Sequence, residues 1–203
     1  MADGPPAARD AGLRHRSGNV GGRRSVHFIS RWLQAKRYAA VLPQVRGRLL
    51  DIGCGRNGLV RSYGDGIGVD VHPWPGVDVL IGDAARLPFP DGCFDTIAFV
   101  ACLNHIPNRL AALREARRCL RAGGRVLITM IGPRISKTWH RINRRWDEDQ
   151  TERGMKTGEV YGIGRSEMRD LLEQAGFEIV ERRPFLLRLN TLYIARTCDP
   201  RSL

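Results

Sequence analysis

The chain lacks the features of a membrane or secreted protein. Its 203 residues contain no apolar run near the roughly 18 to 20 residues of a membrane-spanning helix, and residues 1–6 lack the apolar core of a secretory signal. The five cysteines are scattered without a C-x-x-C pair, and no His, Asp or Glu cluster has metal-ligand spacing. We therefore expect a cytoplasmic protein with reduced thiols, no disulfide framework and no metal.

Acidic residues are scarce relative to basic ones, and the net charge is +12. Residues 1–48 alone contain ten Lys or Arg against two Asp, which leaves +8 in this part of the chain. Such an excess could serve nucleic acid, an anionic membrane or an acidic partner. Residues 1–24, however, are rich in Gly and Pro and contain no aromatic residue to stack on bases. We expect a disordered, solvated tail here, with an RNA-binding arm as the alternative.

Residues 25–203 are long enough for one α/β domain, and no internal repeat divides them. The first helical pattern starts at Ser25 and stops before Pro43. Its apolar stripe includes Trp32, which we expect to pack in the core.

A glycine-rich turn after a short apolar strand is the most informative segment. Residues 49–52 form the expected strand, Gly53 and Gly55 follow, and a second apolar strand ends on Asp70. Glycine permits positive φ and close approach to a ligand. A carboxylate at the end of the second strand is where nucleotide-binding α/β folds hold a ribose, because it accepts hydrogen bonds from both vicinal hydroxyls.

The spacing of Gly53, Gly55 and Gly58 also satisfies the G-x-G-x-x-G pattern of dinucleotide sites. Asp51 favours a different ligand, because a carboxylate there would repel a pyrophosphate and would suit a cationic ammonium group. Together with Asp70, it indicates an adenosine joined to an amino acid. A strand-to-turn junction without a ligand is the alternative.

These residues resemble the first two motifs of the class I S-adenosylmethionine-dependent methyltransferases, and the resemblance covers about residues 45–197. Residues 79–84 look like the third strand with its acidic end, and residues 87–95 are similar to the L-P-F-P-D-x-S-F-D run of the type 11 small-molecule branch. The resemblance implies an α/β, three-layer Rossmann-like methyltransferase fold. Its sheet would be seven-stranded and mostly parallel, with an antiparallel last strand.

The expected second and third strands are separated by residues 72–76 only. A parallel crossover usually needs a dozen or more residues, so we expect the helix between these strands to be reduced to a turn. Further along, the pattern predicts a helix over 108–120 ended by the glycines at 123 and 124, and a strand over 125–130. A helix capped by Ser166 and two last strands should follow.

The resemblance implies S-adenosyl-L-methionine as the cofactor. Within the family pattern, Asp83 accepts a hydrogen bond from the adenine amino group and the backbone N–H of Ala84 meets a ring nitrogen. The cofactor-binding residues implied in this way are Asp51, Gly53, Cys54, Gly55, Asn57, Asp70, Val71, Asp83, Ala84 and Ala101.

His105 follows the fourth expected strand, at the sheet edge where α/β folds bind ligands. Its imidazole could take a proton from the acceptor as a general base. Alternatively, it caps the next helix or lines the sulfonium pocket. Residues 104–107 do not form the Asn/Asp-Pro-Pro-Tyr motif, and no cysteine has the Pro-Cys context of cytosine-5 enzymes, which argues against base methylation.

An insertion at about residues 133–163 is expected to close over the acceptor as a lid. Aromatic walls with guanidinium groups suit an aromatic or sugar-like acceptor carrying an anionic group. An amphipathic helix with buried tryptophans is the alternative. The expected substrate residues are Trp139, His140, Arg141, Trp146 and Tyr161.

The leading function is therefore methyl transfer from S-adenosylmethionine to a small molecule by in-line SN2 displacement. Two alternatives remain, an RNA-directed methyltransferase using the basic arm and a non-catalytic cofactor-binding partner protein. The intact set of Asp51, Gly53, Gly55, Asp70 and Asp83 argues against the last, because a site without a ligand has no need of all five.

Overall fold

The structure is a computed structural model that describes residues 20–133 and 158–198. Its centre is a seven-stranded sheet of order β3-β2-β1-β4-β5-β7-β6. The strands are β1 Leu49–Ile52, β2 Gly66–Asp70, β3 Val79–Leu80, β4 Phe94–Val100, β5 Leu120–Ile131, β6 Phe177–Phe185 and β7 Asn190–Thr197. The helices are α1 Val20–Val41, α2 Gly58–Tyr63, α3 Arg109–Cys119 and α5 Arg165–Gln174, with 3-10 helices η1 Leu42–Gln44 and η2 Leu103–His105.

The strand directions confirm the expected fold. Strands β3, β2, β1, β4 and β5 pair in parallel, whereas β7 runs antiparallel to both β5 and β6. The strand order reverses at β1, which lies between β2 and β4. The carboxyl ends of these three strands therefore meet at a topological switch point, where open α/β sheets bind their ligands.

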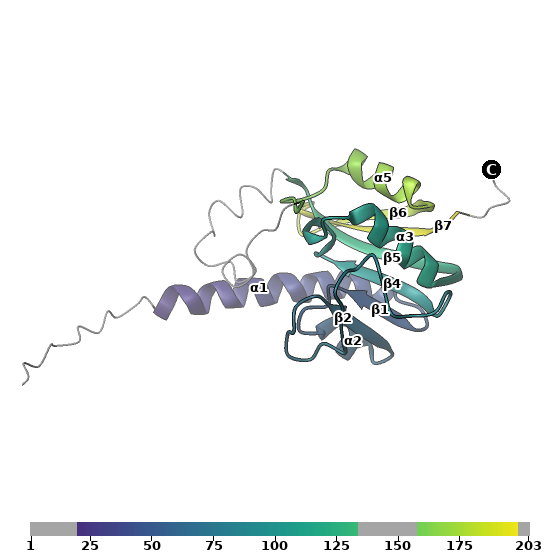
Figure 1. Ribbon diagram of the computed structural model, residues 1–203. Coiled ribbons are helices and arrows are strands. Elements are labelled where there is room, and N and C mark those ends of the chain that lie inside the picture. Colours follow the sequence, from purple (N-terminus) through teal and green to yellow (C-terminus); the bar gives the residue numbers. More distant parts are fainter. Residues whose placement is uncertain (1–19, 134–157, 199–203) are drawn as a thin grey trace, which may run out of the picture.

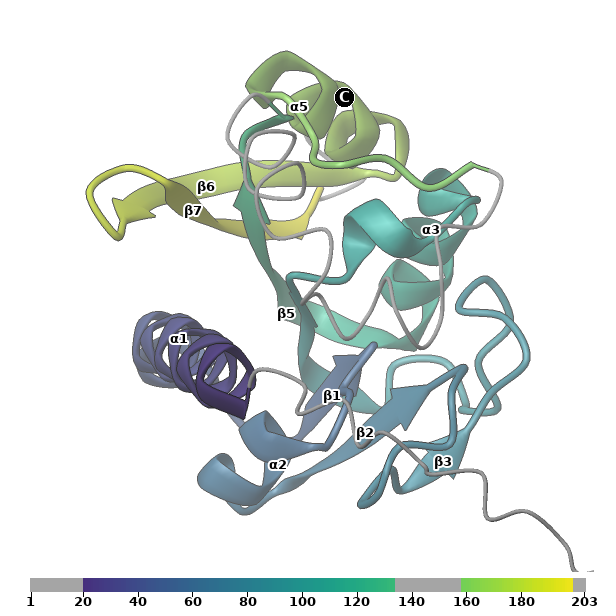
Figure 2. The same ribbon diagram turned by 90° about the vertical axis from the view of Figure 1, so that its left-hand side faces the viewer.

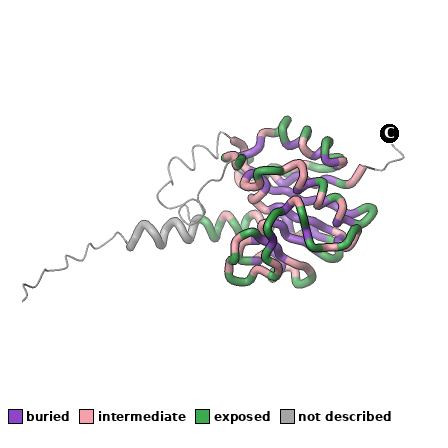
Figure 3. The backbone as a smooth tube through the Cα atoms, viewed as in Figure 1, coloured by how far each residue is buried: buried purple, intermediate pink, exposed green. Residues whose placement is uncertain are grey.

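Helices cover both faces of the sheet, as Figures 1 and 2 show. Helices α3 and α5 lie on one face, where Leu113 and Met168 join the larger apolar core. Helices α1 and α2 lie on the other face, where Val41 and Leu59 join a second core. The buried strands between the two layers are visible in Figure 3. This is the expected three-layer arrangement.

The crossover between β2 and β3 contains only turns, as its length predicted. The N–H of Asp78 bonds to the carbonyl of Gly68 at 3.1 Å, and that of Ile81 to the carbonyl of Asp70 at 2.9 Å. These bonds bring the chain directly back to the sheet edge without a helix.

Helix α1 differs from the prediction in its start and in its packing. It begins at Val20 and not at Ser25, so the boundary expected after residue 24 falls inside the helix, and residues 1–19 lie outside the described part. Trp32 is 47% exposed, with Lys36 Nζ 5.7 Å from its ring centroid, so its predicted core packing is wrong. The helix projects past the sheet and packs on the core through its C-terminal end, which includes Val41 (Figure 1).

Two local predictions are also corrected. Helix α3 ends at Cys119 and β5 begins at Leu120, so the glycine pair lies inside the strand instead of ending the helix. The pairing of β5 with β4 is irregular there, and Gly123 takes a φ of +76° that a glycine accepts without strain. Ser166 does not cap α5, because the N-cap position is Gly164 and it makes no side-chain cap.

Candidate active site

The turn after β1 is packed against the end of β4. Gly53 has a φ of +71°, and a Cβ at this position would lie 2.6 Å from Cβ of Cys102. The Cys102 thiol also donates a hydrogen bond to the carbonyl of Ile52 at 2.8 Å. Gly55 has a φ of +54°, and a Cβ there would meet no atom within 4 Å. The turn is therefore tight on its inner side and has open space at Gly55, as close approach of a ligand requires.

Asp51 is a buried carboxylate with little compensation from the protein. It is 2% exposed, and its Oδ1 has no hydrogen-bond partner among the described residues. Burial and the nearby charge of Asp70 raise the pKa of Asp51 to about 8. Buried carboxyl groups normally have partners, so this atom calls for a donor, and a cationic one would favour the ionised form most.

Asp70 closes β2 and fixes the turn from the other side. Its Oδ2 accepts from the N–H of Gly55 and its Oδ1 from the N–H of His72, both at 2.9 Å. A carboxylate oxygen has two lone pairs, so each oxygen can accept one further hydrogen bond from a ribose hydroxyl. One side chain can thus fasten the turn and bind a diol.

Asn57 lies in the turn with a φ of +57° and is 2% exposed. Its Nδ2 donates to the carbonyl of Gly76 at 2.9 Å and to Oδ2 of Asp78 at 2.7 Å. Asp78 also accepts from the N–H of Gly68 at 2.8 Å. The amide of Asn57 therefore ties the glycine turn to the short crossover, and its role as a cofactor ligand stays a prediction. Sequence reasoning missed Asp78, whose only signal was its position in the shortened crossover.

Cys54 is 5% exposed, and burial with the nearby charge of Asp51 raises the pKa of its thiol to about 12. Its backbone N–H bonds to the carbonyl of Val69 at 3.1 Å. Such a thiol stays protonated and unreactive. Any contribution of Cys54 to ligand binding would therefore come from its shape.

The crossover after Asp70 presents aromatic and apolar surface. Val71 is 42% exposed. The His72 and Trp74 rings lie with centroids 4.3 Å apart, and the Arg56 guanidinium lies 5.8 Å from the Trp74 ring. This surface directly follows the proposed ribose-binding residue. Sequence reasoning had singled out only Val71 in it.

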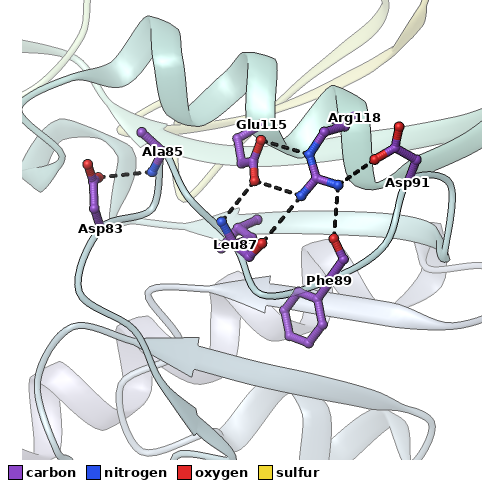
Figure 4. Close-up of polar contacts among 7 residues, drawn as sticks. All are labelled: Asp83, Ala85, Leu87, Phe89, Asp91, Glu115 and Arg118. Carbon is purple, nitrogen blue, oxygen red and sulfur yellow. Dashed lines mark hydrogen bonds and ion pairs between the residues drawn. The ribbon is translucent and has the colours of Figure 1, made fainter.

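Asp83 and Ala84 lie in the loop after β3. Asp83 is exposed, and its Oδ1 accepts from the N–H of Ala85 at 2.9 Å (Figure 4). Ala84 is 5% exposed. The carboxylate therefore shapes its own turn. Its contact with adenine stays a prediction, for which one lone pair of the bonded oxygen and the whole second oxygen are available.

The following loop is held to α3 by Arg118, as Figure 4 shows. The guanidinium contacts both carboxylate oxygens of Glu115, at 2.9 and 2.7 Å, and Oδ1 of Asp91 at 2.6 Å. It also donates to the carbonyl of Phe89 at 2.9 Å, and Glu115 accepts from the N–H of Leu87 at 2.8 Å. Hydrogen bonding to Arg118 lowers the pKa of Glu115. Arg118 and Glu115 therefore fix this loop to α3 together.

Ala101 directly follows β4 and has a φ of +55°, a conformation that costs energy for any residue with a Cβ. Its N–H bonds to Oγ1 of Thr129 at 3.0 Å on the neighbouring strand. The strained backbone immediately precedes the Cys102 contact with the glycine turn. The geometry therefore brings Ala101 to the same sheet edge as the two aspartates.

His105 ends η2, three residues after Cys102. Its Nδ1 lies 3.3 Å from Oε2 of Glu159, and the exposed fractions of the two side chains are 20% and 1%. His105 does not cap the following helix, because the side chain of Asn108 does so by accepting from the N–H of Ala111. Sequence reasoning had given Glu159 no chemical role.

Helix α1 reaches the site through Tyr38. A Cβ at Gly58 would lie 2.8 Å from Oη of Tyr38, so the ring packs directly on the start of α2. Burial and the charge of Asp51 raise the pKa of Tyr38 to about 12. This contact had no signal in the sequence, because it depends on how α1 crosses the sheet.

Of the expected substrate residues, only Tyr161 is described, and it is 39% exposed. Trp139, His140, Arg141 and Trp146 lie outside the described residues. Within the described ranges, no group of three or more His, Cys, Asp and Glu side chains could hold a metal ion. No helix in these ranges is long and apolar enough to cross a membrane.

A glycine turn flanked by Asp51 in β1 and Asp70 at the end of β2, on a sheet whose β7 is antiparallel, is typical of an α/β protein of the methyltransferase type. A family model described as a methyltransferase domain matches residues 23–182. The chain therefore belongs to the class I S-adenosylmethionine-dependent methyltransferases, and it is of the type 11 kind.

Among curated proteins, the chain is similar to the ubiquinone/menaquinone biosynthesis C-methyltransferase UbiE of Burkholderia mallei. The two are 28% identical over an alignment of 121 residues, and the match covers 50% of this chain and 48% of the relative. The chain thus spans about half the length of the curated relatives it matches.

Solved structures with the same fold include an S-adenosylmethionine-dependent methyltransferase of Thermotoga maritima. It is 21% identical, with a TM-score of 0.60, and the match covers 85% of this chain and 96% of that one. A second match comes from the complex between the Haloferax volcanii Trm112 methyltransferase activator and a methyltransferase. Its identity is 17% and its TM-score 0.66, with 88% and 95% of the chains covered. At these identities the likeness shows the fold.

Proposed function

We propose that this protein binds S-adenosyl-L-methionine and transfers its methyl group to a small-molecule acceptor by in-line displacement. The observation that carries the proposal is Asp51, a buried carboxylate beside an open glycine turn, whose Oδ1 has no hydrogen-bond partner in the described part of the chain. An ammonium group at Asp51 and a ribose at Asp70 would satisfy both side chains. A pyrophosphate would bring further negative charge to Asp51, which disfavours a dinucleotide.

When bound, S-adenosylmethionine supplies an electrophilic methyl carbon on a positively charged sulfur. The protein's part is to hold and align the reactants and to exclude water, which lowers the entropic barrier. We assign adenine binding to Asp83 and Ala84, with Val71 beside the ribose and Ala101 toward the reacting end. The backbone of the turn at Gly53, Cys54 and Gly55 would follow the amino-acid part, and Asn57 would keep that turn in place.

For the acceptor, we propose a small molecule with an aromatic, heterocyclic or glycosyl body and an anionic group. The similarity to UbiE, named as a quinone-biosynthesis C-methyltransferase, supports an acceptor of this size. The lid residues Trp139, His140, Arg141, Trp146 and Tyr161 have the aromatic and basic chemistry to bind it. His105, at the carboxyl edge of the sheet, would act as the general base.

The test of cofactor binding is calorimetry with S-adenosylmethionine and S-adenosylhomocysteine, for which we expect micromolar affinity. Asp70→Ala should weaken binding at least about tenfold, because a charged two-point contact worth roughly 1.5 to 3 kcal/mol is lost. Asp65→Ala, which removes an exposed carboxylate immediately before the same strand, is the matched control and should leave the affinity unchanged. Absence of heat with both ligands, or tighter binding of NAD, would exclude the proposal.

The acceptor is best sought with a metabolite panel scored by release of S-adenosylhomocysteine. The wild-type protein should be compared with a variant in which Trp139 and Trp146 are both alanine. A true acceptor should be turned over more slowly by the variant, and equal turnover would remove the lid residues from the site. RNA affinity that falls steeply with salt and vanishes on deletion of residues 1–24 would instead favour the RNA-directed alternative.

A further inference from the structure

A buried carboxylate lies beside the histidine at the end of β4. Glu159 has a side chain that is only 1% exposed, and its Oε2 lies 3.3 Å from Nδ1 of His105. The two residues are 54 positions apart in the chain, so the contact is made by the fold. A buried carboxylate is costly unless it is paired, and the imidazole supplies that pairing here.

The backbone around Glu159 is fixed to the backbone around His105. The N–H of Val160 bonds to the carbonyl of Asn104 at 2.9 Å, and Nδ2 of Asn104 returns a bond to the carbonyl of Val160 at 3.2 Å. On the other side, the Arg109 guanidinium donates to the carbonyl of Gly158 at 2.9 Å. Glu159 is thus held from both flanks, which is the support that a positioned polar pair needs.

This pairing determines which imidazole nitrogen carries the proton. An ionised carboxylate only accepts hydrogen bonds, so Nδ1 of His105 is the donor in this contact when Glu159 is ionised. In the neutral ring the other nitrogen, Nε2, then carries the lone pair. The charge of Glu159 would also stabilise the imidazolium formed when Nε2 takes up a proton.

The pair lies close to the proposed methyl-transfer site. Cys102, three residues before His105, touches the glycine turn at Gly53 and bonds to the carbonyl of Ile52. The N–H of His105 in turn bonds to the carbonyl of Cys102 at 2.8 Å. A short and rigid path therefore connects the turn that would hold the cofactor with the imidazole.

We propose that Glu159 is a positioning residue that sets the tautomer of His105, so that Nε2 accepts the acceptor's proton during methyl transfer. The proposal rests on the proposed function and narrows the acceptor to one whose attacking O, N or C atom carries a proton. An O or N atom bonds to the methyl carbon with its lone pair, and a C atom does so with the electron pair of an adjacent π bond, as the carbon–sulfur bond breaks toward sulfur. Its proton passes to Nε2 of His105 and is later released to water.

The tautomer can be measured without cofactor or acceptor. In protein labelled with ¹⁵N-histidine, with the His105 signals assigned through His105→Gln, the neutral ring of the wild type should carry its proton on Nδ1. Glu159→Ala should move the proton mainly to Nε2, whereas Glu159→Gln should keep it on Nδ1, because the amide oxygen still accepts. Glu178→Gln, an exposed change on β6, is the control and should match the wild type. An unchanged tautomer in Glu159→Ala would overturn the proposal.

The kinetic test uses an acceptor found by the metabolite panel. Glu159→Ala should lower kcat about 10²-fold or more, and Glu159→Gln about tenfold, because the amide orients the ring but lacks the charge. Affinity for S-adenosylhomocysteine should stay within about twofold of the wild type in both. A kcat near that of the wild type in the alanine variant would overturn the proposal. If that variant fails to fold, the glutamine variant decides on the same readouts.

The two proposals fail in different ways. If the wild-type protein binds neither S-adenosylmethionine nor S-adenosylhomocysteine, the proposed function is wrong whatever the tautomer. If binding and turnover are present but His105 carries its proton on Nε2 in the wild type, only the role of Glu159 is wrong.

Discussion

Replacing Asp51 with asparagine should stabilise the ligand-free protein, and the gain should grow as the pH rises. Burial and the charge of Asp70 raise the pKa of Asp51 from an ordinary value of 3.8 to about 8. Between these two values the native protein holds a proton that the unfolded chain has already lost. Stability must therefore fall with rising pH in this window, because the unfolded state binds fewer protons than the native state. Asparagine carries no charge at any pH, so this loss disappears in the variant.

The magnitude follows from the width of the window. Each pH unit in which only the native state is protonated costs about 1.36 kcal/mol of stability. Between pH 5 and pH 8, the difference in unfolding free energy between Asp51→Asn and the wild type should therefore grow by about 3 to 4 kcal/mol. That is a large part of the roughly 5 to 15 kcal/mol that stabilises a typical domain.

Urea unfolding of both proteins at pH 5, 6, 7 and 8, without ligand, measures this difference. Any pH-independent effect of the new amide shifts all four values equally, so the slope isolates the charge. Asp65→Asn, which neutralises an exposed carboxylate, should give a difference from the wild type that does not change with pH. Parallel curves for Asp51→Asn and the wild type would refute the reasoning, since they would mean that Asp51 is ionised at no cost.

Three further outcomes are expected. Binding of S-adenosylhomocysteine at pH 7 should release about one proton from Asp51, because the ligand's ammonium group favours the ionised form of this buried carboxylate. Calorimetry in buffers of different ionisation enthalpy would detect this release. Gly68→Ala should lower the free energy of unfolding in urea by about 1 to 3 kcal/mol, because the new Cβ would overlap the Asn57 amide. The control Gly82→Ala, with open space around it, should change the same quantity by less than about 0.5 kcal/mol. Arg118→Lys should lower the free energy of unfolding by about 1 to 3 kcal/mol, because an ammonium group cannot reproduce the two-point contact of the guanidinium with Glu115. The control Arg114→Lys, on the same helix, should have little effect in the same assay.

Much of the fold follows from local features of the sequence. Short apolar runs separated by glycine turns predict buried parallel strands, and the strand over 49–52 followed by Gly53 predicts a tight turn at the end of β1. Even the missing helix between β2 and β3 follows from counting residues. These predictions succeed because strand periodicity and backbone reach depend only on neighbouring residues.

The polar contacts of the site could not be predicted in the same way. Asn57 bonds Asp78 across 21 positions, and His105 meets Glu159 across 54. Which side chains meet at such separations is decided by how the crossovers fold back onto the sheet. For the same reason the exposure of Trp32 was missed, because a helical stripe does not reveal how far a helix extends past the sheet it packs on.

Because no helix lies in the crossover between β2 and β3, hydrogen bonds from side chains hold the glycine turn after β1 in place. A helix packed between β2 and β3 would fix the glycine turn through apolar contacts, but here only turns connect the strands. Asp78 bonds to both Asn57 and Gly68, and Asp70 bonds to Gly55, so two carboxylates anchor the turn from the crossover side. None of these bonds reaches Oδ1 of Asp51, which has no hydrogen-bond partner among the described residues. A cationic ligand would therefore favour the ionised form of Asp51, which links the stability of this fold to the binding that we propose for it.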